Sequence, residues 1–125
     1  PLPALRPLVS SRLPSGFLST TANSLEGYVT TETFGVVRGI TVRSRSIVGM
    51  FGAVLQRFVG GDISLLTELC EETRARAFAE AIAHAQALGA NALIAVRYDA
   101  TEIMQGVSEV LCYGTAVRVV PQRPH

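Results

Sequence analysis

The stretch that decides the fold is residues 90–120, which reads ANALIAVRYDATEIMQGVSEVLCYGTAVRVV. Two apolar, β-branched runs, residues 92–98 and 107–120, are separated by a polar patch that ends in Gln105-Gly106. Such a pattern is typical of two antiparallel strands joined by a tight turn. Because residues 93–96 are apolar on both faces, we expect the first strand to be covered on both sides.

The register of this hairpin depends on the length of its turn. If Gln105-Gly106 forms a two-residue turn, Glu102 falls opposite Glu109. A longer loop would shift the pairing and could place Arg97 near Glu109 instead. The sequence leaves both registers open.

A long helix is expected immediately before the hairpin, over residues 63–88. Its apolar face is predicted from residues that recur at helical spacing: Leu66, Cys70, Thr73, Ala77, Ala81, Ala85 and Leu88. Gly89 is the residue expected to end it. Two i,i+4 pairs, Glu72–Arg76 and Glu80–His84, are expected on the solvent side. A helix that leads into a hairpin must cover one sheet face, so the sequence predicts an α+β fold with the helix on an antiparallel sheet.

The first half of the chain carries weaker signals. Residues 28–31 and 34–42 are rich in β-forming residues, and Gly35 and Gly39 inside the second run predict a bulge or a close backbone approach. Residues 47–59 have apolar residues at helical spacing and predict a helix that packs closely. The alternative for that segment is a poorly formed helix or a mobile loop.

The chain is expected to hold one domain, at residues 18–120, between two tails. Residues 1–17 are basic, Ser-rich and free of acidic residues, as in transit peptides, but prolines at positions 1, 3, 7 and 14 prevent the amphipathic helix that such peptides need. We therefore interpret this segment as a disordered or cloning-derived tail. Residues 121–125 form the C-terminal tail.

The composition favours self-association. Hydrophobic residues make up 48% of the chain and charged residues only 17%, which leaves apolar surface for other subunits to cover. Between residues 26 and 120 there are eight Arg and ten acidic residues, a net charge of −2. The basic cluster expected of a nucleic-acid-binding surface is therefore missing.

No apolar run approaches the roughly 18 residues needed to span a bilayer. The two cysteines, Cys70 and Cys112, lie far apart and outside any zinc-binding spacing. We expect two buried, reduced thiols, and hence a cytoplasmic protein with neither a membrane nor a nucleic acid as partner.

Two sets of polar residues are candidate sites. Arg43 and Arg45 precede the helix predicted at 47–59, where an anion would be attracted. Arg97 and Asp99, at the start of the polar patch, are included as possible ligand contacts. The alternative role for the arginines is pairing with acidic residues across a subunit interface.

Metal binding and catalysis have less support. Glu102 or Glu109, repeated around a symmetry axis, could form a carboxylate ring for a hard cation. A nucleophile needs a neighbouring base, and the sequence offers no such arrangement. We therefore do not expect an enzyme, and no cofactor is identified.

Four motifs, in order along the chain, carry a family resemblance. They are residues 34–45 (FGVVRGITVRSR), Gly60-Gly61, residues 87–92 (ALGANA) and residues 98–114. Together they resemble the YbjQ family over residues 18–120. The resemblance implies a dodecin-like subunit that assembles into a ring-shaped homo-oligomer, a pentamer. The family is described as heavy-metal-binding, and it has no accepted catalytic residues to carry over.

The leading hypothesis is a homo-oligomeric module that binds a small ligand or metal ion between subunits. The alternative is a structural or protein-interaction ring without ligand chemistry. An enzyme with a site shared between subunits is the third hypothesis.

Overall fold

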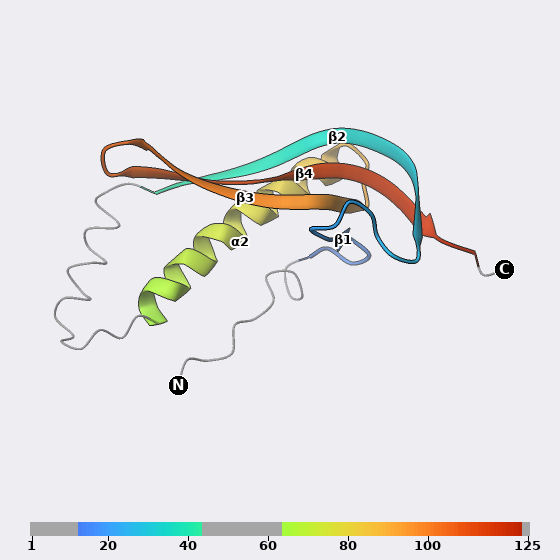
Figure 1. Cartoon of the computed structure of the whole chain (residues 1–125), viewed down its shortest axis with the longest axis horizontal. Coiled ribbons are helices and arrows are strands. Elements are labelled where there is room, and N and C mark those ends of the chain that lie inside the picture. The colour runs from blue at the N-terminus through green and yellow to red at the C-terminus, as the bar shows by residue number, and fades with distance from the viewer. Residues whose placement is uncertain (1–12, 44–63, 124–125) are drawn as a thin grey trace.

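The described part of the chain forms two layers, with one helix packed against one face of a four-stranded sheet (Figure 1). The structure is a computed structural model that describes residues 13–43 and 64–123. Its elements are β1 (Leu18–Ser19), β2 (Tyr28–Arg43), α2 (Ser64–Ala87), β3 (Ala92–Met104) and β4 (Val107–Pro121). The strand order is β1-β3-β4-β2.

The predicted α+β class and the predicted hairpin are confirmed. β3 and β4 pair antiparallel and meet at a turn formed by Gln105 and Gly106, where Gly106 adopts a positive φ of 78°. The prediction of a purely antiparallel sheet is wrong in one respect. β1 runs parallel to β3, with Leu18 opposite Ala92, so the sheet is mixed.

Neither expected register of the hairpin occurs. The turn is two residues long, with Met104 opposite Val107, but a bulge between Glu102 and Met104 shifts the pairing by one residue. Glu102 therefore lies opposite Ser108. Glu109 lies opposite Thr101, and Arg97 opposite Tyr113.

The two glycines of β2 have different roles. Gly35 lies at a bulge and adopts a positive φ of 106°, which favours glycine. Gly39 is buried where the strand passes under α2. A Cβ atom there would lie 1.9 Å from the carbonyl oxygen of Ala77 and 2.6 Å from the amide nitrogen of Ala81. The close approach predicted from the sequence therefore occurs at Gly39.

The predicted long helix is confirmed as α2. It ends in the hydrogen bonds of a Schellman motif, from the amide of Gly89 to the carbonyl of Gln86 and from the amide of Ala90 to that of Ala85. Gly89 adopts the positive φ that the motif requires, 95°. The predicted Glu72–Arg76 ion pair is also present, at 2.8 Å.

The predicted apolar face of α2 is confirmed in the middle of the helix, but the prediction is wrong at both ends of the face. Cys70 and Leu88 were expected on this face but are exposed. The buried face is built around two large side chains, Phe78 and Ile82, together with Thr73 and four buried alanines, at positions 75, 77, 81 and 85. Burying each large side chain contributes roughly 1.5–3 kcal/mol. The second predicted helix, residues 47–59, lies outside the described residues.

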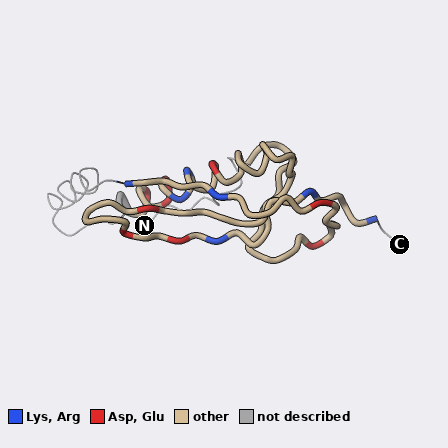
Figure 2. The backbone as a smooth tube through the Cα atoms, turned by 90° about the horizontal axis from the view of Figure 1, so that it is seen from above, with Lys and Arg blue, Asp and Glu red and all other residues tan. Residues whose placement is uncertain are grey.

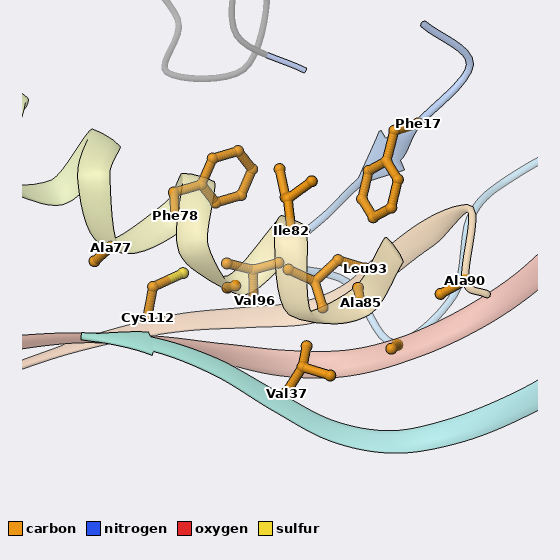
Figure 3. Packing of buried hydrophobic residues seen from close by; sticks show 12 residues of the cluster. Phe17, Val37, Ala77, Phe78, Ile82, Ala85, Ala90, Leu93, Val96 and Cys112 are labelled. Atoms are coloured by element: carbon orange, nitrogen blue, oxygen red, sulfur yellow. The ribbon is translucent and has the colours of Figure 1, made fainter. Parts of the chain in front are cut away.

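The main core lies between α2 and the sheet (Figure 3). Phe78 and Ile82 pack over Leu93 and Val96 of β3, with Val37 of β2 and other buried side chains completing the cluster. On the opposite face, Ala92, Val117 and Val119 form a smaller cluster under Leu18, Leu25 and Ile94. The beginning of β3 is therefore covered on both sides, as its sequence predicts. Phe17, at the end of the predicted tail, is itself buried in the main core.

Residues 20–22, which precede β2 and are called the strap below, fix a bulge in β3 through backbone hydrogen bonds. Ala95 adopts a positive φ of 55°, and its amide donates a hydrogen bond of 2.8 Å to the carbonyl of Ala22. The amide of Val96 donates to the carbonyl of Thr20. The bulge turns the following residues over, so that Val96 and Tyr98 face the helix while Arg97 faces the other side.

No helix among the described residues combines the length and the apolar character that crossing a bilayer requires.

Candidate functional site

Arg43 ends β2 on the face that α2 covers. Its Nε donates a hydrogen bond of 2.9 Å to Oγ1 of Thr73, a residue of α2 that is only 5% exposed. The Thr73 hydroxyl in turn donates to the carbonyl oxygen of Leu69 at 2.8 Å. The helix therefore holds one side of the Arg43 guanidinium in a fixed position.

A second nitrogen of the guanidinium is unsatisfied. Nη2 of Arg43 is shielded from solvent, and within the described chain it has no hydrogen-bond partner. Oγ1 of Thr41, two residues earlier on the same face, is also buried and unpaired. Leaving a buried polar group without a partner costs about 1–3 kcal/mol, and more when the group is charged. Two such atoms, on residues two apart on the same face of β2, mark a place where an acceptor belongs.

The other predicted ligand contacts do not join Arg43. Arg97 and Asp99 pair with Tyr113 and Leu111, on the face opposite α2. Nη1 of Arg97 donates to the carbonyl oxygens of Thr21, at 2.8 Å, and Val96, at 2.9 Å. Arg97 thus fastens the strap to β3. Arg45 lies outside the described residues.

The two predicted metal-binding carboxylates face opposite sides of the hairpin. Glu102 pairs with Ser108, on the same face as Arg43, and its Oε1 accepts the amide of Gly106 at 3.1 Å. Glu109 pairs with Thr101 on the other face. Within one subunit, the two carboxylates cannot contribute to the same site.

Cys112 is buried beside Tyr98, its partner in the register of β3 and β4. Burial raises the pKa of the Cys112 thiol to about 11, although its hydrogen bond with Tyr98 acts in the opposite direction. Burial and the neighbouring thiol raise the pKa of Tyr98 well above its ordinary value. Cys112 is therefore the inert buried thiol that the sequence predicts, whereas the same prediction for Cys70 is wrong because Cys70 is exposed.

The described residues do not make a heavy-metal site within one chain. Over residues 13–43 and 64–123, no three His, Cys, Asp or Glu side chains gather where they could hold an ion. A soft metal needs deprotonated thiolate ligands, and the raised pKa of Cys112 opposes that state. The donor set described for a single chain therefore does not fit such a metal.

Glu80 and His84 do not act as the i,i+4 pair expected from the sequence. Oε2 of Glu80 accepts the backbone amide of Ile40 at 3.2 Å, and Nδ1 of His84 accepts that of Arg38 at 3.4 Å. Both amides belong to β2, an outer strand of the sheet. Unpaired edge amides invite strand addition, so these two side chains of α2 block the middle of this edge.

Among residues 13–43 and 64–123, part of the other edge of the sheet, at β3, has no neighbouring strand. β1 pairs with only two residues of β3, and in the described chain no strand borders residues 98–104 on that side. The tip of the hairpin extends away from α2 (Figure 1). It carries two exposed apolar side chains, Ile103 at 53% and Met104 at 63% exposure.

Acidic and basic residues are interspersed along the described chain, with no basic cluster (Figure 2). This distribution agrees with the slightly acidic domain deduced from the sequence.

The sequence indicated Arg43 as a site residue, but neither its hydrogen-bond partner Thr73 nor the unpaired Thr41 on the same face of β2. Thr73 did give a signal, because it is a polar residue within the predicted apolar face of α2. A buried hydroxyl there needs a partner, and Arg43 supplies one. The roles of Glu80 and His84 gave no comparable signal, because exposed charges on a helix usually contact water.

Comparisons with known proteins give a consistent result. A YbjQ family model with the description "Putative heavy-metal-binding" matches residues 17–120. A "UPF0145 protein" of Solibacter usitatus is 65% identical over 102 residues, which cover 82% of this chain and 91% of the relative. A second, from Chromobacterium violaceum, is 59% identical over 102 residues, with coverage of 82% and 87%. A third, from Burkholderia thailandensis, is 57% identical over 103 residues, with coverage of 82% and 93%.

Proposed function

The chain belongs to the YbjQ family, and we propose that it is one subunit of a ring-shaped homo-oligomer, a pentamer, that binds a small ligand. The proposal rests on one observation above the others, the open outer edge of β3. A sheet edge with unpaired amides and carbonyls is a template for a strand of another chain. Blocking of the opposite edge by Glu80 and His84 leaves β3 as the favoured contact.

The exposed apolar side chains support the same assembly. Ile103 and Met104 extend the open edge at the tip of the hairpin. Val36, Ile40 and Val42 are exposed on the face of β2 opposite α2. Contact between subunits would remove such side chains from water, with a gain of about 25 cal/mol for each Å² of apolar surface.

The ligand part of the proposal rests on Arg43 and Thr41, whose unpaired buried atoms require an acceptor. The two free cysteines also favour a reducing compartment, so we place the assembly in the cytoplasm.

A ring without ligand chemistry is the second candidate. It is favoured by the lack of any three-donor cluster in the described part of the chain. Under this alternative, the acceptor for Arg43 would be a group of the protein itself, and purified assemblies would carry no small molecule.

Native mass spectrometry of the full chain tests the proposal. We expect a species of five times the 13.3 kDa chain mass with an additional small mass that is lost on activation. Replacing Ile103 by Lys should shift the distribution to monomer, because a charge would be buried at the contact. The control is Leu88→Lys, also an exposed apolar position, at 43% exposure, but beyond the end of α2. A wild-type monomer would refute the assembly, and a pentamer without added mass would favour the second candidate.

A further inference from the structure

Arg43 carries a positive charge that no described group neutralises. Arginine side chains bind acidic groups as cations. The ion pair found among the described residues joins Arg76 and Glu72, elsewhere on α2. Glu102 shares the face of Arg43, across Ser108, but its carboxylate accepts a hydrogen bond from Gly106 in the turn. The charge therefore still requires an anionic partner.

The orientation of the free donors is fixed by their neighbours. Thr73 accepts the hydrogen bond of Nε and so fixes the plane of the Arg43 guanidinium, in which Nη2 is buried and unpaired. Thr41 adds an unpaired hydroxyl from the same face of β2. Residues two apart on a strand have Cα atoms roughly 7 Å apart, so a single group with several acceptor oxygens can lie between the two side chains.

We propose that Thr41 and Arg43 bind a small free oxyanion of the phosphate or carboxylate class. Guanidinium groups recognise such anions through charge-assisted hydrogen bonds. Both donor atoms are already shielded within one chain, so a small anion suits this position better than a side chain of a neighbouring subunit. The inference names the ligand class of the proposed function and rests on its ligand-binding part, but it does not require assembly.

Thermal unfolding in the presence of added anions tests this site. Inorganic phosphate and acetate are titrated separately into the full chain at constant ionic strength, with chloride as the reference. We expect one of the two to raise the Tm saturably, by roughly 5 °C at about ten times its Kd. The anion that raises the Tm shows whether the site recognises phosphate or carboxylate.

The rise in Tm on addition of the anion should depend on Arg43. The variant Arg43→Met is expected to lose it, whereas Arg38→Met, which removes an exposed arginine from the opposite face of the same strand, should retain it. Thr41→Val keeps the charge and should show a smaller rise, which preserves the test if Arg43→Met does not fold. No saturable rise in the wild type, or equal rises in all variants, would overturn the proposal.

Mass measurements on the same samples separate this inference from the proposed assembly. A pentamer without an Arg43-dependent rise would reject the anion site alone. A monomer with such a rise would reject the assembly and retain the site.

Discussion

Gly39 is the residue at which β2 and α2 touch through their backbones. A methyl group there has no room, because the atoms it would meet, the Ala77 carbonyl and the Ala81 amide, belong to the helix backbone. We predict that Gly39→Ala lowers the free energy of unfolding by at least about 2 kcal/mol. Val36→Ala, at a side chain that is 68% exposed on the same strand, should change it by less than about 0.5 kcal/mol. Urea denaturation measures both, and equal stability of the two variants would show that helix and strand do not meet at Gly39.

Cys112 makes the stability depend on alkaline pH. Its pKa is raised in the folded chain from an ordinary 9.0 to about 11, so the folded state favours the neutral thiol. The contribution of Cys112 to stability should be constant below about pH 9 and fall as the pH rises toward 11, because the unfolded chain loses the proton first. The pKa of Tyr98 is also raised in the folded chain, so Tyr98 should make stability fall further at the upper end of this pH range.

The variant Cys112→Ala should make this decline shallower, whereas Cys70→Ala, at the exposed thiol, should leave it unchanged. Urea midpoints measured between pH 7 and pH 11 compare the three proteins. Identical slopes in all of them would contradict the assignment of the decline to Cys112.

At the scale of single elements, α2 protects the edge of β2. Because Glu80 accepts the amide of Ile40, that amide should exchange slowly although no strand of the described chain lies on the outer side of β2. We predict that Glu80→Ala accelerates its hydrogen exchange about tenfold, the effect of losing one hydrogen bond to a charged group. Glu72→Ala, which removes only a surface ion pair with Arg76, should leave the exchange unchanged. Equal exchange of Ile40 in both variants would exclude the protective role of Glu80.

The elements themselves could be predicted because their signals are local. The spacing along α2, the C-terminal Gly89 and the turn at Gln105-Gly106 each act within a few residues. The register could not be predicted, because the bulge at Ala95 accompanies hydrogen bonds to the distant residues Thr20 and Ala22, and a second bulge before Met104 shifts the pairing by one residue. The same bulge at Ala95 determines that Arg97 faces away from Arg43, so only part of the predicted ligand set could lie together.

At the scale of the whole molecule, the two sheet edges differ. α2 blocks the edge at β2, whereas residues 98–104 of β3 have no neighbouring strand in the described chain. The resemblance to the YbjQ family implied a ring, and this asymmetry offers a physical route to one. An open edge that pairs with a different surface of the next subunit makes a head-to-tail contact, which generates a closed ring when the rotation is right.

Hydrogen exchange of residues 98–104 across a range of protein concentrations tests this account most directly. If the β3 edge joins subunits, its outward amides should be protected at high concentration and lose protection on dilution, together with the loss of pentamer mass. Amides of the main core, such as that of Leu93, should show no such dependence. Rapid exchange of the β3 edge at every concentration, in a sample that remains pentameric, would contradict assembly through this strand.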